Sequence, residues 1–334
     1  MNKTTSTMRA LRVDRPGGDF IAVDLPRPVP GKGQVLVRIH ASGVNPLDAK
    51  IRAGQAAHAK QPLPAVLGID MAGVVEQVGP GLTAFQLGDE VYGMAGGVGG
   101  QQGTLAEFIA ADARLLARKP TRLSMREAAA LPLAVITAWE GLVDRARVSA
   151  GQTVLVQGGA GGVGHVAVQL ARARGAHVFA TVAVEDFDLV RAWCATPIDF
   201  RSETVENYVA THTGSQGFDI VFDAVGGAVL DASFTAARRY GGHVVSILGW
   251  GTHSLASLSF RAATYSGVFT LLPLLTGEGR EHHGDILREA AALVDAGLLT
   301  PRLDAHRFTL ATAQAAHERV GSGAGQGKVV VDLA

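Results

Sequence analysis

The segment TVLVQGGAGGVGHVAVQL, residues 153–170, decides the fold of this 334-residue chain. It begins with the apolar run of a buried strand and ends with apolar residues spaced as on one face of a helix. Between them Gly159, Gly161 and Gly164 match the pattern G-x-G-x-x-G. Glycine there permits a tight turn, a close approach of the backbone to a pyrophosphate, and packing of helix on strand. Because a strand precedes the glycines and a helix follows them, the segment predicts a dinucleotide-binding loop.

Strands and helices alternate on the C-terminal side of this loop. The later strands are expected at residues 177–181, 198–200, 218–222 and 244–248, and the helices at 163–174, 185–193, 203–212 and 229–239. Such alternation predicts a doubly wound parallel sheet. Residues 8–118 instead show short strands separated by Gly, Pro and Asp turns, which predicts a β-rich module. Within that module, the glycine-rich stretch 93–103 is expected to be a flexible loop.

Composition excludes several classes of protein. The 30 Lys and Arg balance the 30 Asp and Glu, and no basic run follows a phosphate backbone, so nucleic acid is not an expected partner. The one cysteine, Cys194, excludes an intramolecular disulfide and a cysteine-rich zinc site. Residues 1–9 are polar, and no apolar run is long enough to span a bilayer. We therefore expect a cytoplasmic protein without a membrane segment.

The strand ends indicate which nicotinamide cofactor binds. NAD-specific sites place an acid at the end of the second strand, on the ribose 2′-hydroxyl, whereas Thr181 stands there. The absence of a carboxylate favours NADP. Arg201, after the third strand, either pairs with the 2′-phosphate or is a solvated charge at a helix start. Residues 223–227 and 248–250 end the fourth and fifth strands, where doubly wound sheets bind their ligands.

Taken together, these motifs resemble the quinone oxidoreductase and zeta-crystallin branch of the medium-chain dehydrogenase/reductase superfamily. The most specific match is the extended glycine motif, residues 151–172. Supporting matches are ASGVNPLD at 41–48, LGIDMAGVV at 67–75, GDEVYG at 88–93, DAVGG at 223–227 and GKVV at 327–330. The resemblance runs almost from one end of the chain to the other.

The resemblance implies an α/β fold in which a Rossmann doubly wound parallel sheet is inserted between two parts of a GroES-like, β-rich catalytic domain. The catalytic domain would comprise residues 1–134 and 270–334, and the NADP-binding domain residues 135–269. Zinc-dependent relatives have Cys, His and Cys where this chain has Asn45, Ile69 and Leu133. We therefore expect no metal, and without a Lewis acid ordinary alcohol oxidation is disfavoured.

The same alignment supplies catalytic candidates. Asn45 would hold a substrate carbonyl near the nicotinamide, or else form the turn before Pro46. Asp48 is either a cleft carboxylate or a structural one. Lys50 would stabilise a developing oxyanion if it faced the cleft, and is otherwise a solvated lysine. Thr137 corresponds to a position that contacts the nicotinamide end, although a threonine in an apolar helix also bonds to its own backbone.

The sequence thus predicts an NADPH-dependent, zinc-independent reductase that transfers hydride to quinones or α,β-unsaturated carbonyls, and a homodimer formed through the last Rossmann strand. The alternatives are a low-turnover, crystallin-like NADPH-binding protein and an alcohol dehydrogenase. The expected cofactor-binding residues are Thr137, Gly159, Ala160, Gly161, Gly162, Val163, Gly164, Thr181, Arg201, Val225, Leu248 and Gly249.

Overall fold

The computed structural model describes residues 7–333, and contacts within the chain divide it into two units. The first unit comprises Met1–Leu133, Leu271–Asp295 and Pro301–Ala334. The second comprises Ala134–Thr270 and the short return Ala296–Thr300, which the sequence pattern did not predict. Each unit has its own sheets and its own core.

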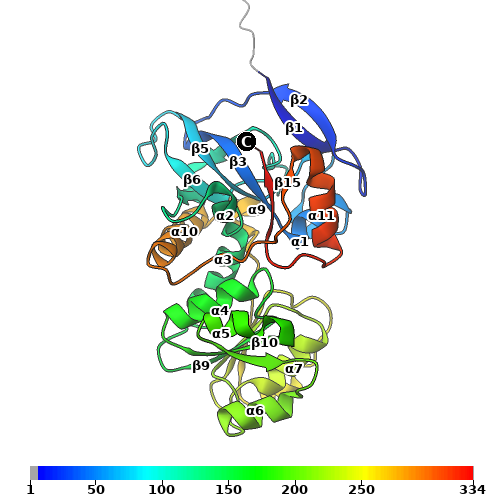
Figure 1. Ribbon diagram of the computed structural model, residues 1–334, viewed down its shortest axis with the longest axis vertical. Coiled ribbons are helices and arrows are strands. Elements are labelled where there is room, and N and C mark those ends of the chain that lie inside the picture. Colours follow the sequence, from blue (N-terminus) through cyan, green and yellow to red (C-terminus); the bar gives the residue numbers. More distant parts are fainter. Residues whose placement is uncertain (1–6, 334) are drawn as a thin grey trace, which may run out of the picture. The chain divides into compact units, whose positions relative to one another are not determined.

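The first unit is built on a seven-stranded sheet in the order β15-β16-β3-β5-β6-β8, with β7 also paired to β3, and on a three-stranded sheet β2-β1-β4 (Figure 1). The strands are β1 (Thr7–Val13), β2 (Ile21–Pro26), β3 (Gln34–Val44), β4 (Ala65–Val66), β5 (Asp70–Val78), β6 (Glu90–Met94), β7 (Phe108–Asp112), β8 (Leu116–Arg118), β15 (Phe308–Thr309) and β16 (Val329–Asp332). Its helices are α1 (Pro46–Arg52), η1 (Ala57–Ala59), η2 (Ala113–Leu115), α2 (Met125–Ala129), α9 (Leu272–Thr276), α10 (Arg280–Asp295), η5 (Leu310–Thr312) and α11 (Ala313–Gly321).

Strand β3 is the centre of the large sheet of the first unit because it pairs with β5, β7 and the C-terminal strand β16. Its residues QVLVRIHASGV are largely buried, as expected of an interior strand. It pairs antiparallel with β5 and with the C-terminal strand β16, in a register that sets Val329 opposite Val44. Lys328 therefore lies beside Asn45, although 283 residues separate them in sequence.

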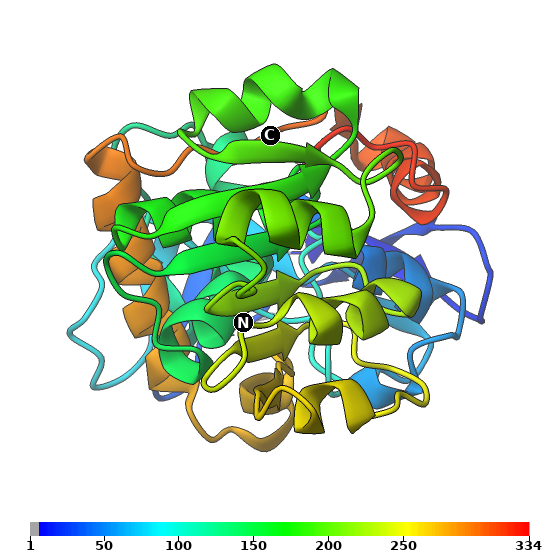
Figure 2. The ribbon, with the colours of Figure 1, turned by 90° about the horizontal axis from the view of Figure 1, so that it is seen from below.

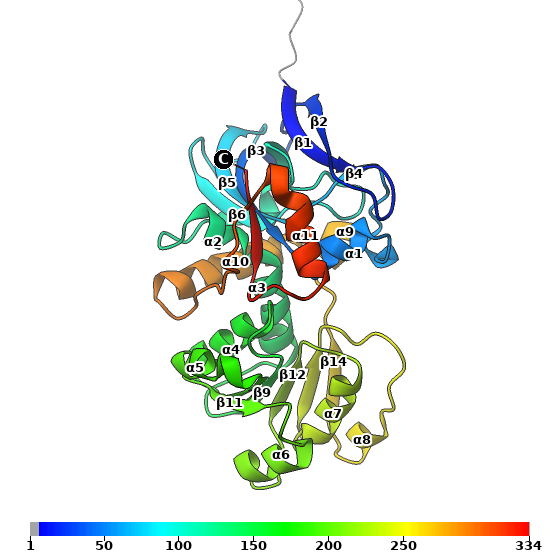
Figure 3. The same cartoon turned by 45° about the vertical axis from the view of Figure 1, so that its right-hand side comes forward.

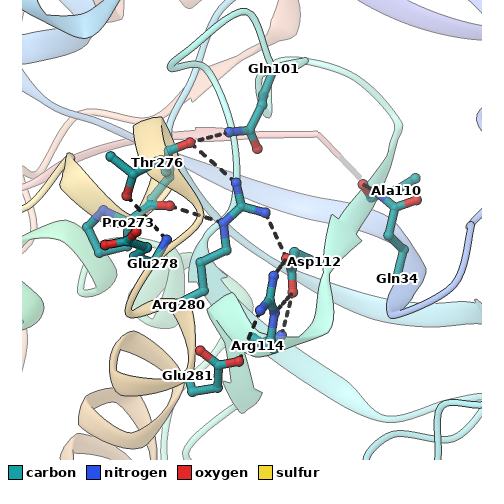
Figure 4. Close-up of polar contacts among 11 residues, drawn as sticks. Gln34, Gln101, Ala110, Asp112, Arg114, Pro273, Thr276, Glu278, Arg280 and Glu281 are labelled. Atoms are coloured by element: carbon teal, nitrogen blue, oxygen red, sulfur yellow. Dashed lines mark hydrogen bonds and ion pairs between the residues drawn. The ribbon is translucent and has the colours of Figure 1, made fainter.

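The glycine-rich stretch 93–103, which the sequence predicts as a flexible loop, is hydrogen-bonded to three other segments of the first unit. The amide of Gly99 donates to the carbonyl of Ala59 (2.9 Å), and that of Gly100 donates to Gln61 Oε1 (2.8 Å). Gln101 Nε2 donates to the carbonyl of Leu274 in α9 (2.8 Å; Figure 4). Backbone and amide bonds replace the side-chain packing that glycines lack, and they order the loop.

An ionic network fixes the segment α9–α10 to the sheet (Figure 4). Arg280 donates from Nη1 to Asp112 Oδ2 (2.8 Å) and from Nε to the carbonyl of Pro273 (3.1 Å). Asp112 also accepts from Arg114, and these bonds outweigh burial and lower the pKa of Asp112 to about 2. A cation at the C-terminus of α9 also interacts favourably with the helix dipole.

The second unit is the predicted doubly wound sheet, with six parallel strands in the order β11-β10-β9-β12-β13-β14. The strands are β9 (Thr153–Gln157), β10 (His177–Val182), β11 (Thr196–Asp199), β12 (Ile220–Asp223), β13 (His243–Ser246) and β14 (Thr264–Gly267). The helices are α4 (Gly164–Ala173), η4 (Val184–Asp186), α5 (Phe187–Ala192), α6 (Val205–Thr213), α7 (Ala228–Ala236) and α8 (Ala256–Ser259), and α3 (Pro132–Trp139) leads into the π-helix η3 (Glu140–Arg145). The expected α/β fold class is confirmed.

Helices cover both faces of this sheet (Figures 2 and 3). Val221 and Val244 pack into a core with α6 and α7, whereas the alternate residues Phe222 and Val245 contact η3 at Gly141. Every residue of β12 is consequently buried, the pattern of a parallel strand covered on both faces. The order of the strands reverses between β9 and β12, and ligands bind doubly wound sheets beyond the strand ends at such a reversal.

None of the described helices has the length and apolar character needed to cross a membrane.

Candidate functional site

The glycine loop after β9 has the geometry of a phosphate-binding turn. A Cβ on Gly159 would lie 2.5 Å from the Cβ of Ala180, and one on Gly164 would overlap the carbonyl oxygen of Gly158. Glycine is therefore required at both positions to pack α4 against the sheet. A Cβ on Gly161, by contrast, would meet only the oxygen of Gly158, at 3.2 Å, which leaves that part of the backbone open to a ligand.

The N-terminus of α4 completes this turn. Val163 occupies the N-cap position of α4, and its side chain has no atom that could cap the helix. The amides of His165 and Ala167 close the turn by donating to the carbonyls of Gly161 (3.1 Å) and Val163 (3.0 Å). The positive end of a helix dipole at such a turn attracts an anion. The residues predicted for the cofactor phosphates, 159–164, thus fit a dinucleotide.

Thr181, a predicted cofactor-binding residue near the end of β10, is bonded to the start of the glycine loop. Its hydroxyl donates to Gln157 Oε1 (2.7 Å) and accepts from the amide of Gly158 (3.0 Å), and the residue is buried. The strand continues one residue further, to Val182. The hydroxyl of Thr181 thus positions the start of the glycine loop, and the predicted cofactor contact of this residue stays a prediction.

Arg201 is exposed beyond the end of β11 and pairs with Glu185, which follows β10 (3.1 Å). The cation and the anion of this pair lie near the end of the second strand, where Rossmann folds bind the ribose. A 2′-phosphate would compete with Glu185 for the guanidinium. The structure therefore leaves Arg201 available as a phosphate ligand without committing it to that role.

The turns after β12 and β13 lie next to the glycine loop. Val225 is half-exposed, and its side chain would be 2.9 Å from a Cβ on Gly158. Asp223 holds its own turn by accepting the amides of Val225 (3.1 Å) and Gly226 (3.0 Å). Leu248 contacts Gly226, so the predicted cofactor residues Val225, Leu248 and Gly249 share the carboxyl edge of the sheet.

Thr137 lies in α3 with its hydroxyl 3.0 Å from that of Thr270. Both side chains are buried. The pair joins the two segments of the second unit that adjoin the first unit in sequence. Its place neither requires nor opposes the predicted contact with the nicotinamide end.

In the first unit, Asn45 is the centre of a buried polar cluster. Its Nδ2 donates to Asp70 Oδ2 (3.0 Å), and its Oδ1 accepts from Nζ of Lys328. Its backbone amide donates to Asp48 Oδ2 (2.8 Å), which fixes the start of α1. Asn45 is 1% exposed, and both of its amide atoms are bonded within the cluster. These contacts make it a positioning residue, and its predicted role as a donor to a substrate carbonyl stays a prediction.

The cluster places ionisable groups away from water. Burial raises the pKa of Asp48 to about 7 and that of Asp70 to about 6, although Lys328 lowers both. Burial also lowers the pKa of Lys328. Asp48 Oδ1 is buried without a hydrogen-bond partner among the described residues, whereas Asp70 Oδ1 accepts the amide of Leu133 at the start of α3 (3.0 Å). The predicted candidate Asp48 thus bonds to the N-cap amide of α1 through Oδ2, and its Oδ1 is buried without a partner in the described part of the chain.

Lys50, the other predicted catalytic residue, is exposed on α1. Lys328 was not predicted as a site residue at all. The signal that could have found it is a lysine in the otherwise apolar strand sequence GKVVV at 327–331, since a lysine seldom precedes such a run without a buried partner.

At the positions of the zinc ligands of relatives stand Asn45, Ile69 and Leu133. Ile69 is fully buried and has no donor atom in its side chain. Within residues 7–333, no three His, Cys, Asp or Glu side chains are grouped so that they could hold a metal ion.

Comparison with known proteins identifies the family. Residues 31–121 match the model of the alcohol dehydrogenase GroES-like domain, and residues 194–331 match that of the zinc-binding dehydrogenases. The chain is 34% identical over 310 residues to 2-methylene-furan-3-one reductase of Solanum lycopersicum, with 89% of this chain and 71% of the relative covered. The chain belongs to the medium-chain dehydrogenase/reductase superfamily. As a member, it is 36% identical over 282 residues to the chloroplastic NADPH-dependent alkenal/one oxidoreductase of Arabidopsis thaliana, covering 81% of this chain and 64% of that longer relative.

Solved structures of medium-chain dehydrogenases/reductases agree with this assignment. An alcohol dehydrogenase superfamily protein from Novosphingobium aromaticivorans is 58% identical, with a TM-score of 0.96 over 98% of this chain and 100% of that one. The quinone oxidoreductase from Coxiella burnetii is 29% identical, with a TM-score of 0.82 over 98% and 100%. This superfamily member therefore shares its fold over almost its whole length with a solved quinone oxidoreductase.

Proposed function

We propose that this protein is an NADPH-dependent, metal-independent reductase of α,β-unsaturated carbonyl compounds, with quinones as a second class of acceptor. The observation that carries the proposal is the cluster of Asn45, Asp70 and Lys328. It fills with amide, carboxyl and ammonium groups the region where zinc-dependent relatives have metal ligands. A reductase without a Lewis acid needs an acceptor that spreads the incoming charge onto a carbonyl oxygen.

The relatives support this choice of acceptor. One curated relative is an alkenal/one oxidoreductase, and another is a 2-methylene-furan-3-one reductase. The compounds in both names have a carbon–carbon double bond conjugated to a carbonyl. A relative of known structure is a quinone oxidoreductase. Quinones and enones share one property, because in both the electron pair delivered by hydride ends on an oxygen.

The residues of each unit have separate tasks in the proposed reaction. The loop 158–164 and the turns at Val225 and Leu248 would bind the dinucleotide, whose reduced nicotinamide supplies a hydride for the β-carbon of the acceptor. Asn45 and Asp70 hold the start of α1 and α3. The exposed Lys50 is our candidate donor to the developing enolate oxygen, and water then supplies the proton to the α-carbon.

The proposal is tested by following NADPH oxidation against matched acceptors: a 2-alkenal, a cyclic enone, a benzoquinone and the corresponding saturated aldehyde. We expect turnover of the conjugated acceptors, no turnover of the saturated aldehyde, and undiminished activity after treatment with a chelator. Lys50→Met should lower kcat about tenfold or more, while Lys32→Met, also an exposed lysine, should not.

Two results would contradict the proposal. The first is about one zinc per chain by elemental analysis together with loss of activity on chelation. The second is reduction of the saturated aldehyde in preference to the conjugated acceptors. A normal rate for Lys50→Met would remove only the role assigned to Lys50.

A further inference from the structure

The loop that follows β13, residues 247–255, starts beside the turns of the candidate dinucleotide site. Its second residue, Leu248, contacts Gly226, and Gly226 belongs to the turn that lies against the glycine loop. Most of the loop is exposed. Leu248 is anchored by its amide, which donates to Ser246 Oγ (3.1 Å), but the residues after it leave the sheet.

His253 ties this loop to the neighbouring helix α7. Its Nδ1 lies 2.8 Å from Asp231 Oδ1 in α7, and its Nε2 lies 3.2 Å from the carbonyl oxygen of Trp250 in the loop itself. The imidazole is largely covered, with 12% of its side chain exposed. It also packs edge-on against the ring of Phe234, another residue of α7.

Both partners of this imidazole are acceptors. A carboxylate and a backbone carbonyl have no proton to donate, and a neutral imidazole can donate from only one of its two nitrogens. The two bonds can therefore form together only when His253 carries a proton on each nitrogen. Loss of one proton must break one of them.

The charges around His253 favour that doubly protonated form. Asp231 faces it from α7, and Asp223 acts on it from the end of β12; both raise the pKa of His253 above its ordinary value, as does the bond to Trp250. Tyr265 of β14 contacts the same Phe234 ring, and its raised pKa keeps it neutral. A neutral phenol does not oppose the imidazolium.

The geometry points to His253 as a positioning residue that, when protonated, holds the loop 247–255 in the conformation that binds the dinucleotide. This inference rests on the proposed binding of NADPH, and it adds a dependence of that binding on pH. Deprotonation of His253 frees the loop from α7 or from its own turn at Trp250. The cofactor must then order the loop, so its affinity falls.

The protonation state can be read without the cofactor. Histidine NMR of the unliganded wild type, with the signal assigned through His253→Gln, should give a pKa above 6.5 for His253. Asp231→Asn should lower that pKa, because it removes the anion that stabilises the imidazolium. A pKa at or below 6.5 that does not respond to Asp231→Asn would overturn the inference, whether or not the protein binds NADPH.

The coupling to binding is then measured as the Kd for NADPH between pH 6 and pH 9. We expect the wild type to weaken about fivefold across the titration of His253, and by reciprocity NADPH should raise the pKa of His253. His253→Gln should bind weakly at both ends, and His253→Arg, a permanent cation with several donors, should remove the pH dependence while keeping tighter binding. The matched control is His177→Gln, which replaces an exposed histidine at the first position of β10.

The two failures are distinguishable. Absence of NADPH binding in the wild type at every pH contradicts the proposed function. Normal NADPH binding with identical pH profiles for wild type and His253→Gln contradicts the role of His253 alone.

Discussion

At the scale of single residues, the chain has two kinds of charged side chain. Some are exposed and can exchange one partner for another, whereas others are buried among fixed partners. Arg201 and Glu185 belong to the first kind, since their side chains are 59% and 71% exposed. An exposed ion pair contributes little to the stability of a protein in water. Either side chain can therefore leave the pair and bind another charged group. This is the property required of a group that recognises a phosphate.

We therefore expect Arg201→Ala to weaken NADPH binding about tenfold and to leave NADH binding unchanged, because only NADPH carries the 2′-phosphate. Glu185→Gln should strengthen NADPH binding by releasing the guanidinium. Titration calorimetry with both cofactors measures the difference. Equal losses for NADPH and NADH in Arg201→Ala would exclude phosphate recognition by this residue.

Lys328 belongs to the second kind. It lowers the pKa of both Asp48 and Asp70, whose folded-state values of about 7 and about 6 are nevertheless above those of an unfolded chain. Such carboxyls contribute stability at low pH and lose it as the pH rises through about 4 to 7. Without Lys328 their pKa values would rise further, and the loss would be steeper.

Lys328→Met should accordingly cost about 3 kcal/mol of unfolding free energy at pH 8 and clearly less at pH 5, where the carboxyls are protonated. Denaturant titration at the two pH values measures this difference, with Lys32→Met as the exposed control. A cost that does not change with pH would show that the ammonium group does not interact with these carboxyls.

At the scale of elements, α11 packs on α1 through a histidine that is buried without hydrogen bonds. Neither ring nitrogen of His317 has a partner among the described residues, and the ring meets that of Phe20 edge-on with centroids 4.7 Å apart. Burial, with a smaller effect of Arg52, lowers the pKa of His317 to about 3. The folded chain thus keeps this histidine neutral, whereas the unfolded chain protonates it near pH 6.5.

His317→Leu should therefore remove a source of acid instability. Because the folded-state pKa lies below the unfolded one, the stability linked to His317 is complete above about pH 6.5 and falls by up to about 1.4 kcal/mol per unit as the pH drops toward 3. The stability of His317→Leu relative to wild type should then increase from pH 7 to pH 4. Asp48 and Asp70 titrate in both proteins, so their effect on the unfolding free energy cancels in the comparison. A difference in unfolding free energy that stays constant with pH would contradict the burial of a neutral imidazole.

At the scale of the whole molecule, the outer edge of β14 is the proposed site of association with a second chain. This strand pairs only with β13 in the described chain, and its neighbours Trp250, Phe260 and Phe269 are 54%, 85% and 36% exposed. Unpaired edges with exposed apolar residues favour association. We propose that two copies of the chain meet along this edge.

Light scattering should therefore give the mass of a homodimer at micromolar concentration. Phe269→Lys should shift the equilibrium toward the monomer, because it places a charge in the contact, whereas Phe200→Lys beyond the opposite edge strand β11 should not. Phe200 is 57% exposed and serves as the matched control. A wild type that remains monomeric would contradict the proposed contact.

The sequence by itself determined the second unit, because its signals are local. The strand, the three glycines and the helix of residues 153–170 are contiguous, and the alternation of strands and helices after them requires no distant contact to be recognised. The close approach of Gly164 to Gly158 arises from those same few residues. Here short-range sterics and hydrophobic periodicity suffice.

Only the tertiary structure decided the polar contacts of the candidate site. The bond between Asn45 and Lys328 exists because β16 pairs with β3, and the inward turn of Thr181 depends on Gln157 in a neighbouring strand. The loop 93–103 is ordered by Ala59, Gln61 and Leu274, none of which is its neighbour in sequence. A side chain's partner depends on strand register and helix packing, and these are set by the burial of the whole core, which no local pattern encodes.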